Sequence, residues 1–283
     1  MRRRPAVAGY FYSAESGALR SEVEKFIHPG APKRRVMGAV VPHAGFMYSG
    51  PVAGAVYSSI ELPDNFILIG PNHTGLGAPL SIMVSGDWET PLGIVKINED
   101  LASALMHKFS RLEMDSLAHM REHSIEVQLP FIQYFKKTLS IVPIQMMDVR
   151  LETCRALGHA VAEVIMDLGR RGEAGGEAGL RKPRYPEVLI IASSDMSHYV
   201  PAETAREKDF KAIQKMLDID PEGLYQVIRD LDITMCGFGP TVAMLYACKG
   251  LGAERAELIK YANSGDVSGD YAQVVGYAGV VVE

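Results

Sequence analysis

The sequence lacks the features that mark membrane-spanning, exported and nucleic-acid-binding proteins. None of its apolar runs reaches the length of a membrane span, and no apolar stretch follows the basic residues 2–4 as it would in a signal peptide. The 29 Lys and Arg residues are outnumbered by 34 Asp and Glu residues, so the net charge is −5, without the basic footprint of a nucleic-acid-binding protein. We therefore expect neither a membrane nor a nucleic-acid partner.

Cysteine is scarce, and its three occurrences, Cys154, Cys236 and Cys248, form no CxxC pair. An odd count without an export signal favours a reducing compartment, so we expect a cytoplasmic protein. Cys154 and Cys248 fall on predicted helix faces, where a free cysteine is usually a small buried hydrophobe. Cofactor and catalytic motifs are also missing, since the chain contains no GxGxxG, GxxxxGK[ST], HExxH or GxSxG.

Strand-like and helix-like segments alternate along the 283 residues, which predicts an α/β fold. The strand-like segments are short and β-branched without alternation, as in a sheet that helices cover on both faces. We expect a single domain over residues 1–283, with a central, mostly buried sheet flanked by helices. Residues 169–186 are Gly-rich, and we expect a flexible loop within that domain. The expected strands are residues 36–41, 65–69, 80–84, 93–97, 139–146, 188–191, 257–261 and 271–282, and the expected helices are residues 16–26, 51–60, 99–109, 123–135, 151–168, 202–217, 221–231 and 240–249.

Three of the expected strands each lead into a histidine. Two of them precede His43 and His73, and residues 188–191 lead into a serine-rich turn that ends in His198. Polar side chains at the carboxyl ends of such strands point into the crevice where open α/β sheets bind ligands. Because two histidines and one anionic side chain form a metal site with open positions, we expect His43 and His73 to be metal ligands.

Cys236 directly precedes a predicted helix, where unpaired backbone N–H groups would lower the pKa of its thiol. A thiolate is a good ligand for Fe, Zn or Cu(I), so Cys236 is the candidate for the third ligand. The alternative is that Cys236 is a small buried hydrophobe like the other two cysteines. Glu126 is then the next candidate for a carboxylate ligand.

Three further residues are candidates for proton transfer. Asp195 and His198 lie three residues apart, and a carboxylate within reach of an imidazole fixes its tautomer and raises its basicity. Alternatively, the polar residues of this turn cap the helix that follows. His123 lies between Glu122 and Glu126 at the start of a predicted helix, where acidic residues would also favour the helix dipole. We take Asp195, His198 and His123 as candidate catalytic residues.

The sequence contains six distinctive blocks, at residues 7–12, 42–45, 70–73, 122–126, 193–198 and 236–237, which together span nearly the whole chain. In this order, the six blocks resemble the Memo family. The resemblance implies a fold related to the class III extradiol ring-cleaving dioxygenases, which use non-haem Fe(II); Cu and Zn are the alternative metals. Bacterial and archaeal relatives are often encoded near a radical-SAM protein and an AMMECR1-like protein, which implies a pathway link. By the resemblance, metal-ligand positions correspond to His43, His73 and Cys236, and further pocket positions to Asp195, His198 and Phe11.

Two functions follow from these observations. In the first, the protein is a metal-binding oxidoreductase with an iron site of dioxygenase type, and its small aromatic-type substrate binds beside Phe11 and Tyr48. In the second, the protein is a non-catalytic binding module for a peptide or for iron or copper handling. The dioxygenases have a glutamate where this chain has Cys236, and a cysteine suits the binding or redox handling of a metal.

Overall fold

Strands β2 (Gly38–Val41), β9 (Val188–Ser193) and β3 (Asn65–Pro71) lie side by side in parallel at the centre of a mixed sheet. Nearly all of their residues are buried, as expected for apolar strands that helices cover on both faces. The computed structural model describes residues 1–173 and 188–283 of the chain.

The sheet continues on both sides of these three strands in the order β1-β5-β6-β8-β3-β9-β2-β12-β10. Outside this path, β11 pairs with β12, and β4 pairs with β7 and β8. β8 extends the parallel set next to β3, whereas β12 runs antiparallel to β2. The remaining strands are β1 (Arg2–Arg3), β4 (Leu80–Ile82), β5 (Asp87–Thr90), β6 (Gly93–Ile97), β7 (Glu113–Met114), β8 (Ser140–Met146), β10 (His198–Val200), β11 (Ala256–Asn263) and β12 (Val274–Val282).

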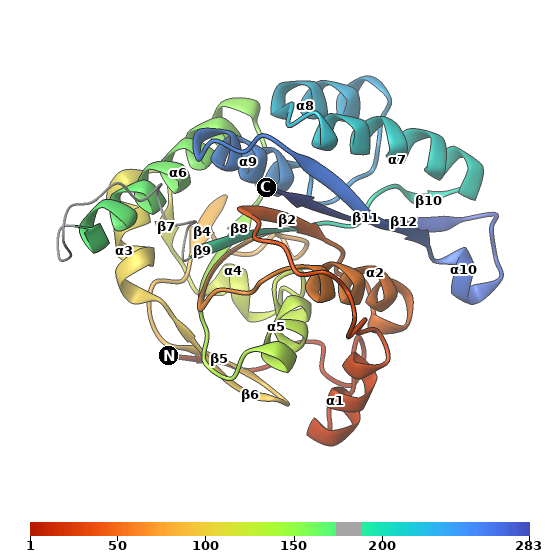
Figure 1. Ribbon diagram of the computed structural model, residues 1–283, viewed down its shortest axis with the longest axis horizontal. Coiled ribbons are helices and arrows are strands. Elements are labelled where there is room, and N and C mark those ends of the chain that lie inside the picture. Colours follow the sequence, from red (N-terminus) through yellow and green to blue (C-terminus); the bar gives the residue numbers. More distant parts are fainter. Residues whose placement is uncertain (174–187) are drawn as a thin grey trace.

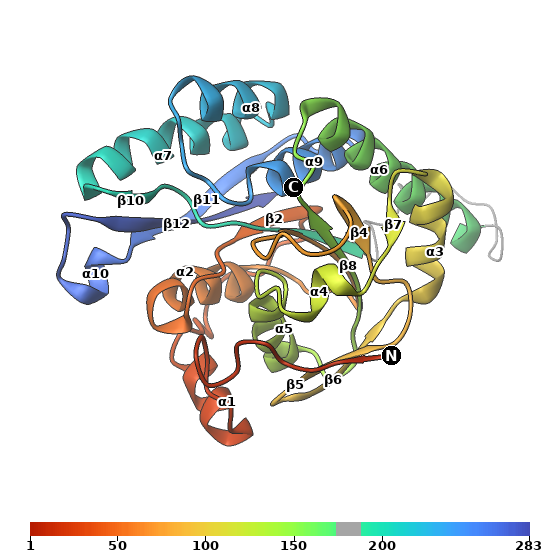
Figure 2. The same cartoon turned by 180° about the vertical axis from the view of Figure 1, so that it is seen from behind.

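Helices cover both faces of the sheet (Figures 1 and 2). Helices α6, α7, α8 and α9 lie on one side, and α1, α2 and α5 lie on the other. The predicted fold class, a single α/β domain with a central sheet flanked by helices, is confirmed. The helices are α1 (Ser16–Glu24), α2 (Phe46–Ser59), α3 (Glu99–Lys108), α4 (Leu117–Met120), α5 (Leu129–Phe135), α6 (Leu151–Glu173), α7 (Ala202–Leu217), α8 (Pro221–Asp230), α9 (Phe238–Gly250) and α10 (Gly265–Ser268), with one 3₁₀ turn, η1 (Glu126–Gln128).

The helix expected over residues 51–60 begins earlier, at Phe46, and contains Pro51. Its small residues are required by close packing, because a Cβ at Gly54 would lie 2.2 Å from the carbonyl oxygen of Phe26. The early start places the first turn of α2 directly after His43. Helix α6 continues to Glu173, so the first residues of the expected loop 169–186 are helical, and the rest lie outside the described residues.

The prediction of a single helix over residues 123–135 is wrong. Only its second half is α-helical, preceded by the 3₁₀ turn η1. The backbone N–H groups of His123 and Ser124 are both bound at 2.9 Å by the side chain of Glu122, which holds this stretch in a turn. Pro130 is accommodated because it lies in the first turn of α5, where its missing N–H has no helical partner to lose.

Candidate metal site

The carboxyl ends of β2, β9 and β3 meet at one edge of the sheet, and three histidine rings lie together there. The ring centroid of His43 is 5.2 Å from that of His73 and 5.4 Å from that of His123, and the latter two are 4.7 Å apart. One ring nitrogen from each histidine lies within 4.8 Å of the other two. This cluster can hold a metal ion, because imidazole is the commonest protein ligand for transition metals.

The three histidines differ in exposure, so the cluster opens to solvent on one side. His43 is only 2% exposed, whereas the side chains of His73 and His123 are 35% and 22% exposed. Burial is the main cause that lowers the pKa of His43, and the neighbouring His123 and His73 add to it. Burial likewise lowers the pKa of His123. His43 and His123 are therefore neutral at pH 7, the form in which an imidazole binds a metal.

Cys236 lies beside His43 in the turn before α9. Its sulfur is 3.2 Å from Nε2 of His43 and accepts a hydrogen bond at 3.3 Å from the backbone N–H of Asp195. The expected third ligand thus adjoins the histidine cluster on the side of His43. His123, expected only as a catalytic residue, lies within the cluster itself.

The expectation that the helix N-terminus lowers the pKa of Cys236 is wrong. Burial and then the charge of Asp195 raise the pKa of this thiol, and hydrogen bonds from the N–H groups of Asp195 and Gly237 offset only part of the rise. The reason is that lost hydration disfavours the thiolate more than the first turn of α9 favours it. Cys236 is therefore a neutral thiol until a cation replaces its proton.

Glu122 orients two of the three histidines. Its carboxylate accepts hydrogen bonds from the backbone N–H of His73 at 2.5 Å and from Nδ1 of the same ring at 3.0 Å, and Nδ1 of His123 lies 3.3 Å away. Burial by itself would raise the pKa of Glu122, but the hydrogen bond from His73 and the nearby rings outweigh it and lower the pKa to about 2. This carboxylate is therefore ionised and fixes Nδ1 of His73 as the protonated nitrogen.

Asp195 and His198 bind backbone groups rather than each other. Oδ1 of Asp195 accepts a hydrogen bond at 2.8 Å from the N–H of His43, and Nδ1 of His198 donates to the carbonyl of Thr234 at 2.8 Å. The carbonyl of Thr234, and not Asp195, thus sets the tautomer of His198. Neither residue caps α7, whose N-cap is Pro201. Burial raises the pKa of Asp195 to about 6 despite the opposing hydrogen bond from His43.

Phe11 and Tyr48, the two aromatic residues expected in the pocket, lie in different surroundings. Phe11 packs against His123 with a centroid distance of 4.8 Å and an interplanar angle of 56°. Its carbonyl accepts a hydrogen bond at 2.8 Å from the N–H of Phe46, the first residue of α2. Tyr48 is half-buried in the first turn of the same helix. Of the two, Phe11 touches a histidine of the cluster.

Glu126, the reserve candidate for a carboxylate ligand, is engaged elsewhere. It forms a fully buried ion pair with Arg3 and accepts hydrogen bonds from the hydroxyl of Tyr12 at 2.5 Å and from the N–H of Ala6 at 2.7 Å. Arg3 in turn donates to the carbonyl of Glu122 at 2.6 Å. These bonds fasten the N-terminal segment to the stretch that carries His123.

Sequence reasoning missed the residues that orient the histidines. From the sequence, Glu122 is expected only to favour the dipole of a helix, although a carboxylate next to a histidine is itself a signal of an orienting role. Ser193 contacts the ring of His43, and Gln128 contacts Ser193, but neither gives a local signal, because they come from different elements.

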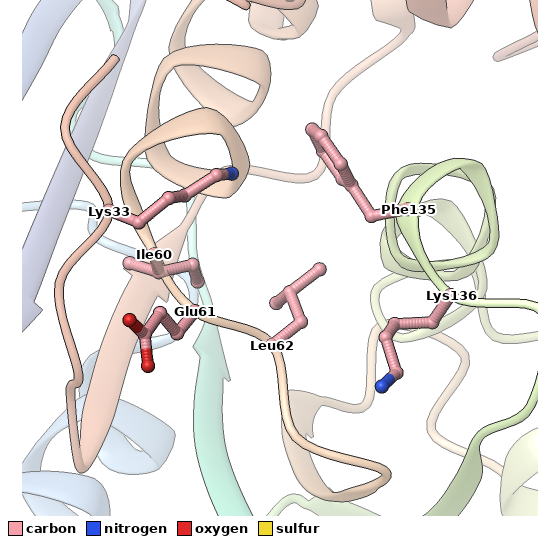
Figure 3. A pocket seen from close by; sticks show the side chains of 6 residues that line it. All are labelled: Lys33, Ile60, Glu61, Leu62, Phe135 and Lys136. Atoms are coloured by element: carbon pink, nitrogen blue, oxygen red, sulfur yellow. The ribbon is translucent and has the colours of Figure 1, made fainter.

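A separate pocket of about 310 Å³ lies beside the segments that lead into β3 and β8, and Figure 3 shows the side chains that line it. None of the expected site residues lines it. It is lined by Lys33, Ile60, Glu61, Leu62, Phe135 and Lys136.

The fold and the histidine cluster define an α/β protein with a candidate metal site at the carboxyl edge of its sheet. Among the helices of residues 1–173 and 188–283, none combines the length and apolar character that crossing a membrane requires. The chain belongs to the Memo-like protein family, which it matches over residues 3–281.

Relatives match along almost their whole length. The chain is 42% identical to a MEMO1 family protein of Methanothermobacter thermautotrophicus, over 98% of this chain and 99% of the relative. It is 44% identical to a MEMO1 family protein of Pyrobaculum arsenaticum, over 99% and 98%. A solved structure of an uncharacterized Escherichia coli K12 protein aligns with a TM-score of 0.54 at 10% identity, over 87% of this chain and 100% of that chain, which supports the fold only.

Proposed function

We propose that this protein binds a transition metal and uses it in oxidoreductase chemistry on a small aromatic-type substrate. Fe(II) is the leading candidate for the metal, ahead of Cu and Zn. The observation that carries the proposal is the convergence of three histidines and a thiol at the carboxyl edge of the sheet. His43 and His73 would hold the metal, with Cys236 or His123 as the third ligand.

The donor set fits a transition metal of intermediate softness. Imidazole nitrogen suits Fe, Cu and Zn, and a thiolate adds a soft anionic donor, whereas Mg²⁺ and Ca²⁺ prefer oxygen. The resemblance to the class III extradiol dioxygenases favours Fe(II) among these. A bound ion of this kind would act as a Lewis acid toward an oxygen atom of the substrate.

Residues of the chain itself would bind the substrate and move its proton. The Nδ1–H of His198 donates to the carbonyl of Thr234, so Nε2 is the ring nitrogen left to accept a proton. Asp195 holds the backbone of His43 in place. Phe11, packed on His123, would offer an aromatic face to a planar substrate.

The second candidate function is a non-catalytic binding module that carries iron or copper or recognises a peptide. The observation that favours it is the thiol of Cys236 beside His43, in place of the harder carboxylate that suits oxygen chemistry. A pathway link to radical-SAM and AMMECR1-like proteins fits either function.

The test is metal analysis followed by an activity assay. Untagged protein purified without chelators is analysed for Fe, Cu and Zn, and the apo-protein is then loaded anaerobically with Fe(II) and assayed for oxygen uptake with catechols and other hydroxylated aromatics. We expect about one equivalent of metal, lost in His43→Ala but retained in the exposed control His107→Ala. Metal binding without oxygen uptake would favour the binding module. An equal loss of bound metal in His43→Ala and His107→Ala would show that the metal does not depend on the histidine cluster.

A further inference from the structure

The buried side of His43 faces a hydroxyl group, and the partners of that hydroxyl determine which ring nitrogen carries the proton. Nδ1 of His43 lies 3.0 Å from Oγ of Ser193, the last residue of β9. Both side chains are almost fully buried, so no solvent competes for these bonds. The proton positions can therefore be assigned by counting donors and acceptors.

The amide of Gln128 has one orientation here. Its nitrogen lies 3.0 Å from the carbonyl of Pro42 and 2.8 Å from Oγ of Ser193, while its oxygen accepts the hydroxyl of Tyr57 at 2.9 Å. The reverse orientation would place the amide oxygen against the carbonyl of Pro42, two acceptors with no proton between them. Gln128 is thus a donor to Ser193.

The single hydroxyl proton of Ser193 is committed to a carbonyl. Oγ lies 2.6 Å from the carbonyl oxygen of Ser124, which can only accept. If that proton pointed to His43 instead, the two oxygens would face each other at this distance without a hydrogen bond. Ser193 therefore donates to Ser124 and accepts from Gln128, so it can only accept from His43.

We infer that Ser193 is a positioning residue that holds His43 as the Nδ1–H tautomer and so makes Nε2 its metal-binding atom. Nε2 is the atom that lies 3.2 Å from the sulfur of Cys236, on the side of the cluster. The functional meaning of this inference rests on the proposed metal site, but the tautomer itself does not. Gln128 supports the arrangement by keeping the hydroxyl of Ser193 from rotating.

The same proton arrangement recurs in the neighbouring histidines with other partners. Nδ1 of His73 donates to the ionised Glu122, and Nδ1 of His198 donates to the carbonyl of Thr234. A fixed tautomer orients the ring and leaves the other nitrogen free to bind a metal. Of the three acceptors, only the one for His43 is a hydroxyl, which can either donate or accept. Ser193 accepts from His43 only because its bonds to Ser124 and Gln128 fix the direction of its own proton.

The experiment compares two serine-to-alanine substitutions, one at the end of β9 and one in the turn that follows it. Ser193→Ala removes the acceptor of His43, whereas Ser197→Ala is a matched control, because the Ser197 hydroxyl is buried without a hydrogen-bond partner among the described residues. Long-range ¹H–¹⁵N spectra of the metal-free, histidine-labelled proteins report the tautomer, with the His43 signals assigned by their loss in His43→Gln. Zn(II) competition titrations of the same three serine forms report affinity.

We expect wild type and Ser197→Ala to show a single Nδ1–H tautomer for His43, and Ser193→Ala to lose it. Zn(II) affinity should fall about 10–100-fold in Ser193→Ala only, as for other partners of metal-bound histidines. An Nε2–H tautomer in the metal-free wild type would overturn the inference whether or not Ser193→Ala folds. Equal affinity losses in the two variants would also overturn it. Failure of the wild type to bind Zn(II), with the Nδ1–H tautomer intact, would instead reject the proposed function.

Discussion

Glu122 binds His73 at two points, through the backbone N–H at 2.5 Å and through Nδ1 at 3.0 Å. The carboxylate is fully buried, and it also accepts the N–H groups of the next two residues in its own turn. It therefore fixes both the ring of His73 and the turn that presents His123. Two of the three clustered histidines depend on this one side chain.

Replacement of Glu122 by glutamine should weaken metal binding. The amide keeps the shape of the side chain but loses the charge that holds the Nδ1–H of His73, so we expect affinity for Zn(II) or Fe(II) to fall about 10–100-fold. Competition titration against a chromogenic chelator measures this. The exposed Glu113→Gln serves as the control, and an unchanged affinity in Glu122→Gln would show that His73 is oriented by other contacts.

Cys236 should decide metal preference more than protein stability. We expect Cys236→Ser to weaken binding of Cu(I) most, because a hydroxyl replaces a soft thiolate, and Cys236→Glu to shift preference toward Fe(II). Because the neutral thiol must lose its proton to bind, affinity in the wild type should rise with pH more steeply than in Cys236→Glu. Titrations with Fe(II) and Cu(I) at several pH values measure both effects. Equal affinities for wild type and Cys236→Ser would leave His123 as the third ligand.

Arg2 and Arg3 are neighbours in β1 but should differ sharply in their effect on stability. The ion pair of Arg3 with Glu126 is fully buried, and removing one partner of such a pair costs about 3–5 kcal/mol. Arg3→Met should therefore lower the melting temperature strongly, whereas Arg2→Met, which loses a solvent-exposed pair with Asp87, should change it little. Thermal unfolding followed by circular dichroism compares them, and similar shifts would mean that the N-terminal segment adds little to the fold.

His119 should contribute to the loss of stability in acid. Burial and then the charge of Arg3 lower its pKa to about 3, and both ring nitrogens lack hydrogen-bond partners among the described residues. Between about pH 6.5 and pH 3 the unfolded chain takes up a proton that the folded chain does not, so stability falls as pH falls through this window. A plot of the free energy of unfolding against pH should therefore be less steep for His119→Met, by up to about 1.4 kcal/mol per pH unit. Urea unfolding across this range, with the exposed His107→Met as control, measures it; parallel slopes would contradict the assignment.

The central sheet and the edge that carries the histidines could be predicted from the sequence, because a general rule relates apolar strands to the polar turns that follow them. Short apolar strands followed by polar turns pack in parallel and bring those turns together, which places His43 and His73 side by side. The class of fold and the region of the site thus follow from strand ends. Segment boundaries near Pro51 and Pro130 do not, because tertiary packing rather than propensity sets where those helices begin.

The position of His123 could not be predicted from local pattern. Acidic residues at helical spacing indicate a helix start, yet the turn is pulled onto the end of β3, where a hydroxyl of Ser124 donates to the carbonyl of Pro71 at 2.9 Å. Gly70 permits this approach, since a Cβ there would lie 2.5 Å from that hydroxyl. The raised pKa of Cys236 escaped prediction for a related reason, because hydration depends on packing from several elements.

The stretch from Glu122 to Gln128 contacts three separate parts of the protein, and these contacts can link distant regions thermodynamically. One end binds His73, its middle pairs with Arg3 in the N-terminal segment, and the other end holds Ser193. If a metal orders this stretch, then docking of the N-terminal segment must raise metal affinity by the same factor by which the metal stabilises that docking. Backbone amides of residues 6–12 should then exchange with deuterium more slowly when the metal is bound, although they contribute no ligand. The N-terminal segment would then be an allosteric element of the candidate metal site.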